Sequence, residues 1–219
     1  MATAELDTIS AKLVGAYSGA VYDVLRELGV SNCALPPAIQ GLAQNFRIAG
    51  PVFTLSGARG SCSAHETLLR WTEFLAKAPC GHVVVCQPND GDLAHMGELS
   101  AAALKLRGVR GYVVDGGTRD SERILQSGFP VFCKYRTPAD IVGRWAPTAC
   151  QEPIAIGGVT ICAGDFILAD IDGVIVIPAG IAAEVADRVE HIAGTESRLR
   201  RAILSGMDPR QAYLEFGLF

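Results

Sequence analysis

The 219-residue chain lacks several features that would place it in a large class of proteins. Its 19 Lys and Arg residues form no block of like charge, and the formal net charge is −4. A nucleic-acid surface needs clustered cations that displace counterions, so we expect no nucleic-acid partner. No apolar run approaches the length of about 20 residues that crosses a bilayer. The opening MATAELDTIS lacks the basic and apolar segments of a secretory signal. We therefore expect a cytoplasmic protein without a membrane partner.

The chain also lacks a CxxC pair and an even set of cysteines. Disulfide frameworks and zinc sites place cysteines in pairs at characteristic intervals, and this sequence has no such spacing. We therefore interpret the cysteines as reduced, mostly buried thiols. The seven cysteines are Cys33, Cys62, Cys80, Cys86, Cys133, Cys150 and Cys162.

Hydrophobic residues are plentiful, at 49% of the chain, which is enough for one sizeable core. No repeat, low-complexity tract or linker divides the sequence, so we expect a single domain over residues 1–219. Apolar residues recur at helical spacing over about residues 1–30. The middle of the chain alternates between strands at 49–57, 81–86, 109–115 and 129–134 and helices at 63–78, 96–108 and 120–128.

Within the helix at 96–108, one face carries Leu99, Ala102, Ala103 and Leu106, and Gly108 is expected to cap its end. Beyond Pro147 the pattern changes to short strands and tight turns. We predict hairpins at 153–162, around Gly157–Gly158, and at 166–178, followed by C-terminal helices at about 181–205 and 208–216. The whole pattern predicts an α/β fold with a central mixed sheet flanked by helices.

The stretch VVDGGTRD, residues 113–120, joins the end of a predicted strand to the start of a predicted helix. We expect GGTR to be the connecting loop, at the edge of the sheet where α/β proteins bind ligands. Its glycines let the backbone approach a ligand closely, and amides at the start of the next helix favour an anion. Arg119 can hold a carboxylate in a two-pronged pair. Asp120 offers hard oxygen to a divalent cation. This pair suits an α-keto acid that chelates a metal.

A purely structural interpretation of the same stretch stays open. Asp120 is also a good residue for the N-cap of the following helix. In that case Arg119 would pair with Asp115 across the loop. The spacing of these residues does not decide between the two interpretations.

A second polar stretch, DGDLAHMGELS at residues 90–100, opens the helix one strand–helix unit earlier. Gly97, Glu98 and Leu99 would present amides and a carboxylate at a neighbouring sheet end. Alternatively, Glu98 only complements the helix dipole. We interpret His95 as a loop histidine, because no second His or Cys stands at a metal-binding interval.

Three segments together resemble the RraA-like family: GELSAAALKLRGVRGYVVDGGTRD, FPVFCKYRTP and GDFILADIDGVIVIP. The most specific motifs are G-E-L, followed by D-G-x-x-R-D, and the later G-D-x-x-x-A-D-x-D-G-V. The resemblance covers about residues 15–217. Cys80, His82 and Ala163 depart from the residues common in the family. That family contains divalent-metal-dependent 4-hydroxy-4-methyl-2-oxoglutarate and 4-carboxy-4-hydroxy-2-oxoadipate aldolases, and also proteins that regulate ribonuclease E without catalysis. Its fold is of the swivelling α/β/α type.

The resemblance implies roles for particular residues. Asp120 would be the direct ligand of Mg²⁺ or Mn²⁺, and Glu98 would hold a metal-bound water. Arg119 would bind the keto acid together with the backbone amides of residues 97–100. Family members form trimers or hexamers with sites between subunits, where Glu196 of a neighbour would reach the metal waters. Judged by its own surroundings in the sequence, Glu196 is an ordinary solvated helix residue. The substrate-binding set implied in this way is Gly97, Glu98, Leu99, Ser100 and Arg119.

The implied reaction is a retro-aldol cleavage of a 4-hydroxy-2-oxo dicarboxylic acid to pyruvate and a second keto acid. Decarboxylation of oxaloacetate would pass through the same enolate. The lysines lie outside the two loops, which agrees with a metal-dependent mechanism that needs no Schiff base. The alternative is a non-catalytic regulator that binds ribonuclease E or another protein. We favour the lyase because a binding module has no need for Asp120, Arg119, Glu98 and Glu196 together.

Overall fold

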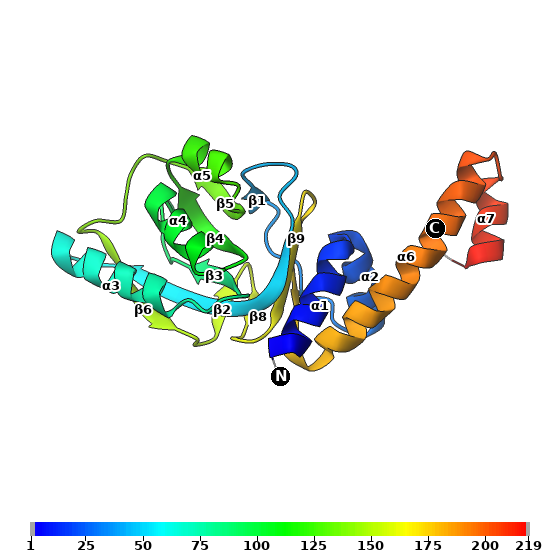
Figure 1. Ribbon diagram of the computed structural model, residues 1–219, viewed down its shortest axis with the longest axis horizontal. Helices are drawn as coiled ribbons and strands as arrows, with labels where there is room; N and C mark the ends of the chain where they lie inside the picture. The colour runs from blue at the N-terminus through cyan, green and yellow to red at the C-terminus, as the bar shows by residue number, and fades with distance from the viewer. Residues whose placement is uncertain (1–2, 218–219) are drawn as a thin grey trace.

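The computed structural model describes residues 3–217, apart from the side chains of residues 194–197. Its helices (Figure 1) are α1 (Thr3–Gly15), α2 (Ser18–Glu27), α3 (Ala64–Lys77), α4 (Glu98–Leu106), α5 (Ser121–Ser127), α6 (Ala182–Leu204) and α7 (Pro209–Phe216), with a 3-10 turn η1 (Ala179–Ile181). Its strands are β1 (Gln40–Gly41), β2 (Ile48–Arg59), β3 (Val83–Gln87), β4 (Gly111–Thr118), β5 (Val131–Arg136), β6 (Trp145–Cys150), β7 (Ile154–Ile156), β8 (Val159–Ile161), β9 (Phe166–Asp170) and β10 (Gly173–Ile177).

These strands form the mixed sheet that the sequence predicts, which confirms the α/β fold class. The main sheet has eight strands in the order β1-β5-β4-β3-β2-β9-β10, and β6 pairs with β2 in addition. Strands β2, β3, β4 and β5 run parallel to one another, with Val84 between Phe53 on β2 and Tyr112 on β4. The remaining pairs are antiparallel. The carboxyl ends of the parallel strands therefore gather at one edge of the sheet, where α/β folds place their ligands.

Three hydrophobic clusters hold the layers together. Helices α3, α4 and α5 pack on one face of the parallel strands through a cluster that includes Trp71, Phe74, Tyr112, Ile124 and Trp145. The β7–β8 hairpin contributes to a second cluster, with buried residues that include Val85, Val113, Ile156 and Ile161. Helices α1, α2 and α6 pack against β9 and β10 at the other end of the molecule (Figure 1), through residues that include Leu13, Leu25, Leu168 and Val185.

The helix boundaries follow from local chemistry. Ser63 caps α3: its Oγ accepts from the Glu66 N–H at 3.2 Å, and the Ser63 N–H donates to Glu66 Oε2 at 2.8 Å. This reciprocal pair fixes the start of the helix. Gly108 and Gly128 follow α4 and α5 with φ of 75° and 70°, values that glycine adopts without steric cost. The predicted cap at Gly108 is confirmed.

Two features of the strands differ from the prediction. Strand β4 continues to Thr118, so Gly117 and Thr118 pair with β5 instead of lying in a loop. The register shifts between Val114 and Gly117, which marks a bulge in the strand. The connection between β4 and α5 is therefore much shorter than GGTR. Strand β6, which pairs with β2, was not predicted from the sequence.

The packing face of α4 differs as well. Ala101 and Leu104 are buried, whereas Leu99 is 80% exposed and Leu106 is 89% exposed. The sequence grouped these two leucines with Ala102 and Ala103 on one face. Ala103 does pack against the core cluster, but the two leucines at the ends of that face are exposed. Both faces of this short helix carry apolar residues, so periodicity alone could not tell which one packs.

The C-terminal helices extend beyond the body of the molecule. The first half of α6 packs on α1 and α2, while its second half projects outward and carries α7, which folds back beside it (Figure 1). Leu204, Tyr213 and Leu214 on this projection are 80%, 54% and 72% exposed. Among residues 3–217, none of the helices has the length and apolar character needed to cross a bilayer.

All seven cysteines are free thiols, as predicted. Cys33, Cys86 and Cys133 are buried, whereas Cys80 and Cys162 are exposed. The expectation that most of them are buried therefore holds for only part of the set. Burial raises the pKa of Cys86 to about 12 and of Cys133 to about 11, so these two thiols stay protonated at neutral pH.

Candidate active site

A hollow of about 730 Å³ lies at the carboxyl edge of the parallel strands. The loop before α4 and the turn after β4 form its polar wall. Helix α3 and the segment after β5 form a mostly apolar wall. The polar wall includes Gly97, Glu98, Ser100, Arg119, Asp120, Arg123 and Asp140, and the apolar wall includes Leu68, Trp71, Leu75, Ile141 and Val142. The hollow therefore brings together the two motifs that the sequence analysis singled out.

Asp120 connects these two motifs directly. It has φ of 54° and ψ of 32°, a left-handed conformation that is uncommon for residues other than glycine but tolerated by Asp. Although Asp120 stands at the N-cap position of α5, its side chain makes no capping hydrogen bond. Its Oδ2 instead accepts from the Glu98 N–H at 3.2 Å, at the start of α4. The interpretation of this carboxylate as an ordinary helix cap is therefore wrong.

Gly97 makes this close approach possible. A β-carbon at residue 97 would lie 2.8 Å from Asp120 Oδ2 and 3.4 Å from Arg119 Nε. Because 2.8 Å is shorter than any normal contact, a side chain here would displace the carboxylate. The glycine is required by space and not by its own φ of −141°, which other residues adopt readily.

Arg119 is held in place by three contacts. Its backbone N–H donates to Met96 O at 2.9 Å, which ties the turn to the loop before α4. Its Nη1 donates to Asp140 Oδ2 at 3.0 Å, and its Nε lies 3.6 Å from Asp120 Oδ2. The alternative pairing of Arg119 with Asp115 is wrong, because Asp115 pairs with Lys134 at 2.5 Å on the neighbouring strand.

Asp140 is a site residue that the sequence analysis missed. It bridges Arg119 and Arg144, whose Nη2 lies 3.1 Å from Asp140 Oδ1. Burial raises the pKa of the Asp140 carboxyl. Hydrogen bonds from Arg144 and the Val142 N–H and the charge of Arg119 outweigh that effect and hold the pKa below its ordinary value. Asp140 is therefore ionised at neutral pH and orients the Arg119 guanidinium.

The other predicted substrate-binding residues lie on the first turn of α4. Glu98 is half-buried, and its N–H is taken by Asp120. Leu99 is largely exposed at the rim of the hollow. The Ser100 hydroxyl accepts a hydrogen bond from Trp71 Nε1 at 2.8 Å, which fastens α4 to α3. The structure thus brings residues 97–100, 119 and 120 to one wall.

His95 precedes α4 in a loop, as predicted, but it is buried, with 1% of its surface exposed. Its Nε2 lies 2.6 Å from Asp90 Oδ2, and its ring stacks edge-on against Trp145 at a centroid distance of 4.9 Å. Nδ1 has no hydrogen-bond partner within the described part of the chain. Burial lowers the pKa of His95, and the Asp90 carboxylate opposes that shift only in part. His95 is therefore neutral at pH 7.

Residues 18–176 match the family model named RraA-like and described as Aldolase/RraA. The chain belongs to the RraA-like family. A protein of Halalkalibacterium halodurans, provisionally named 4-hydroxy-4-methyl-2-oxoglutarate aldolase, is 30% identical over 187 residues, covering 85% of each chain. Protein DlpA of Legionella pneumophila is 32% identical over 206 residues, which are 92% of this chain but only 32% of DlpA. The chain thus spans about a third of the length of that relative.

Solved structures agree with the RraA-like assignment. RraAS2 of Streptomyces coelicolor, described as an unusual member of the RNase ES inhibitor RraA family, is 27% identical with a TM-score of 0.80. The comparison covers 89% of this chain and 97% of RraAS2. An uncharacterised protein from Pseudomonas syringae is also 27% identical, with a TM-score of 0.86 over 98% of this chain and 95% of that protein.

The RraA-like family implies a divalent metal, and the polar wall fits one that keeps most of its water. No group of three or more His, Cys, Asp or Glu side chains that could hold an ion occurs among the described residues. Mg²⁺ often takes only one or two protein carboxylates. Asp120 can supply one from beside Gly97, where its carboxylate lies against bare backbone. Glu98 can supply a second carboxylate from the same wall.

The side chain of Glu196 lies outside the described residues. Its position is in the second half of α6, which projects away from the helices around the hollow (Figure 1). A contribution of Glu196 to the hollow therefore stays a prediction from family resemblance.

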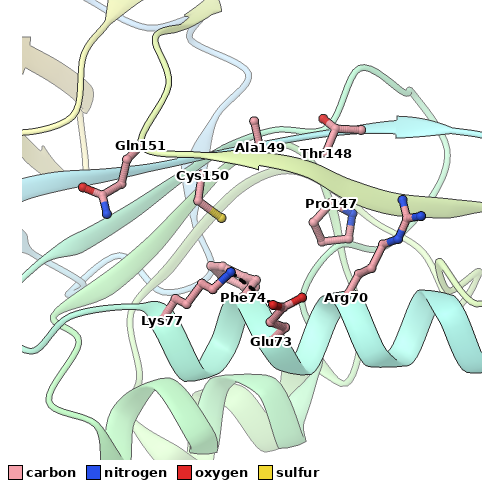
Figure 2. A pocket seen from close by; sticks show the side chains of 9 residues that line it. All are labelled: Arg70, Glu73, Phe74, Lys77, Pro147, Thr148, Ala149, Cys150 and Gln151. Carbon is pink, nitrogen blue, oxygen red and sulfur yellow. Dashed lines mark hydrogen bonds and ion pairs between the residues drawn. The ribbon is translucent and has the colours of Figure 1, made fainter.

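A second hollow, of about 510 Å³, lies between α3 and β6. Figure 2 shows its side chains, among them Arg70, Glu73 and Lys77 from α3 and Cys150 from β6. Lys77 and Glu73 form an ion pair at 3.2 Å. This hollow shares no lining residue with the polar wall, and neither motif of the sequence analysis reaches it.

Proposed function

We propose that this RraA-like protein is a divalent-metal-dependent lyase. It would cleave a 4-hydroxy-2-oxo dicarboxylic acid by a retro-aldol reaction into pyruvate and a second keto acid. The observation that carries the proposal is the wall on which Asp120, Arg119 and the first turn of α4 meet around one hollow. The provisional names of two relatives as 4-hydroxy-4-methyl-2-oxoglutarate aldolases support it.

Asp120 would hold Mg²⁺ or Mn²⁺, and Glu98 would orient water around the ion. When bound, such an ion supplies positive charge to the keto-acid oxygens and lowers the pKa of its bound water. Gly97 keeps the space beside the Asp120 carboxylate free. The free energy that Asp120 gains from its single backbone donor is small, so the carboxylate remains available to a cation.

Arg119 would stabilise the developing enolate. In the cleavage the C4 hydroxyl loses its proton and its oxygen forms the carbonyl of the second keto acid. The C3–C4 bond breaks, its electron pair becomes the C2–C3 double bond, and the π pair of the C2 carbonyl moves to the C2 oxygen. A guanidinium fixed in advance stabilises negative charge at that oxygen without reorganising during the reaction. Asp140 provides this fixation at 3.0 Å. The amides of residues 97, 99 and 100 on the same wall would bind the substrate carboxylate, because the Glu98 N–H already donates to Asp120.

Two further activities belong to the same proposal. Loss of CO₂ from oxaloacetate leaves the same enolate, so oxaloacetate decarboxylation is an expected side activity. Assembly into a homotrimer or homohexamer would let Glu196 of one subunit act in the hollow of the next. The alternative function is that of a non-catalytic regulator, and RraAS2, from a family of RNase ES inhibitors, supports it. Such a regulator would bind ribonuclease E or another protein.

The test is pyruvate release from a panel of 4-hydroxy-2-oxo acids, with Mg²⁺, with Mn²⁺ and with EDTA. We expect activity that EDTA abolishes and either ion restores. Asp120→Asn should lose metal affinity and activity together, with little change in melting temperature, because the Asp120 side chain caps no helix. Full activity in metal-free protein, or normal kinetics of Asp120→Asn, would contradict the mechanism. Inactivity on the whole panel would favour the regulator.

A further inference from the structure

The two arginines on the polar wall differ in their ion pairs. Asp140 and Asp120 both contact Arg119, so its positive charge is already shared between two carboxylates. Arg123 is the second guanidinium that lines the hollow. It lies one turn further, within α5. Among the described residues its guanidinium forms no ion pair or side-chain hydrogen bond. Within the described part of the chain, Arg123 is therefore a cationic group of the hollow without a charged partner.

The rest of the lining is mostly apolar, and its one hydroxyl, that of Thr72, already donates to the carbonyl groups of Leu68 and Leu69. Leu68, Trp71 and Leu75 from α3 form this apolar wall together with Ile141 and Val142. The Trp71 indole N–H, which could have donated to an anion, is already bonded to Ser100 Oγ at 2.8 Å. A carboxylate placed against this wall would lose its hydration without gaining a partner, which is costly. A ligand with acidic groups at both ends must therefore direct both of them to the polar wall.

We propose that Arg123 binds the second carboxylate of the substrate and so selects dicarboxylic over monocarboxylic keto acids. This inference rests on the proposed function and assigns to Arg123 a role separate from that of Arg119. Arg119 holds the keto-acid end, where the enolate develops, whereas Arg123 receives the carboxylate that is attached to C4. A guanidinium suits this task because its planar fork binds a carboxylate with two parallel hydrogen bonds.

The test compares two substrates that differ in the second carboxylate: 4-hydroxy-4-methyl-2-oxoglutarate, which has it, and 4-hydroxy-2-oxopentanoate, which lacks it. For Arg123→Gln we expect kcat/KM on the dicarboxylate to fall about 10- to 100-fold, as for a lost charge-assisted hydrogen bond. On the monocarboxylate the change should be about fivefold or less. Arg123→Lys should recover part of the loss. Arg70→Gln, on the outer side of α3 in the other hollow, is the matched control and should leave both values unchanged.

Three outcomes bear on the inference. Equal loss on both substrates, or no loss on the dicarboxylate, overturns it while leaving the lyase proposal intact. If the native protein cleaves neither substrate, the lyase proposal fails, and binding of 2-oxoglutarate and pyruvate in the presence of Mg²⁺ then tests Arg123 by itself. A weaker affinity of Arg123→Gln for 2-oxoglutarate alone would support the inference. An unchanged ratio of the two affinities, or binding of neither acid, would overturn it.

Discussion

At the scale of single residues, the candidate site depends on small distances more than on unusual residue types. Asp120 and Gly97 are 23 positions apart, yet the carboxylate lies against the glycine backbone. Arg119 is aimed by Asp140, which the sequence places in an unremarkable polar segment. Each of these residues is common, and only their arrangement makes a site.

The first prediction concerns Gly97→Ala. The added methyl group would meet Asp120 Oδ2 at 2.8 Å and displace the carboxylate from its position beside α4. We expect Mn²⁺ affinity to fall about tenfold or more, the size of effect seen when groups that orient a metal ligand are disturbed. Calorimetric titration of metal would measure it. The control is Gly91→Ala, where a β-carbon would meet nothing within 4 Å. Equal metal affinities for the two variants would contradict the prediction.

The second prediction concerns His95. Burial lowers the pKa of His95 in the folded state, so the unfolded chain binds a proton first as the pH falls below about 6.5. The free energy of unfolding should therefore decrease below that pH, by at most about 1.4 kcal/mol per pH unit for this one group. Above pH 7 the contribution of His95 should be constant.

Denaturant unfolding at several pH values would check this prediction with His95→Gln, whose amide can still reach towards Asp90. The variant should be less stable at pH 7 but should lose less stability between pH 7 and pH 5.5. His82→Gln is the control, because His82 is only half-buried and its Nδ1 lies 3.0 Å from the Cys80 carbonyl oxygen, with no carboxylate beside it among the described residues. A pH slope that is the same in native protein and His95→Gln would show that another group is responsible.

At the scale of elements, helix α3 both contributes to the stability of the fold and forms part of the lining of the hollow. It supplies the apolar wall through Leu68, Trp71 and Leu75. Its start depends on Ser63, whose side chain and backbone both bond to Glu66.

The third prediction is that Ser63→Ala lowers the free energy of unfolding by about 1 kcal/mol. The substitution removes the hydroxyl that accepts from the Glu66 N–H and donates to the Glu66 carboxylate. Thermal or urea unfolding would measure the difference. Ser61→Ala, two residues earlier in the exposed connection to α3, should be nearly neutral. If the two substitutions cost the same, the capping box would not contribute to the stability of α3.

The elements also show what the sequence could predict. Tight-turn chemistry identified the β7–β8 hairpin, because Gly157 and Gly158 have φ of 60° and 84° that few other residues accept. Strand β6 was missed because Pro147 interrupts it and it has no clear alternation. Its strand conformation comes from β2, whose Gly57 leaves room for the Trp145 ring. That contact joins residues 88 positions apart, beyond the reach of local patterns.

The candidate site likewise contains some residues that the sequence could predict and others that it could not. The types and loops of Glu98, Arg119 and Asp120 could be predicted, because each motif follows directly from a strand end. The role of Asp140 could not be predicted from the sequence. Asp140 comes close to Arg119 because Ala94 forms β-bridges with both Gly117 and Asp140, and local sequence patterns do not show such contacts. The pairing of Asp115 with Lys134 depends on the register of β4 and β5, which the sequence does not reveal.

At the scale of the whole molecule, the projecting α6–α7 hairpin is the feature that bears on assembly. It exposes Leu204, Tyr213 and Leu214, and it projects on the side of the molecule away from α3, α4 and α5 (Figure 1). The proposal that Glu196 acts in a neighbouring subunit requires this projection to contact a second copy.

The fourth prediction tests that requirement by mixing two inactive variants, Asp120→Asn and Glu196→Gln, after unfolding and refolding them together. If each site combines Asp120 of one subunit with Glu196 of the next, about a quarter of the sites in randomly mixed oligomers should be intact. Each variant refolded alone should stay inactive. Light scattering would establish the size of the assembly. A fully active monomer, or no recovery on mixing, would remove Glu196 from the site.

The pairing of β2 with β9 also has a consequence for synthesis on the ribosome. Residues 48–51 of β2 pair with residues 166–169, so the first four residues of the longest strand have no strand partner until most of the chain has been made. At typical elongation rates of about 5–20 residues per second, these residues wait roughly ten seconds. During this interval Ile48, which is buried in the final fold, is open to any chaperone or nascent chain nearby.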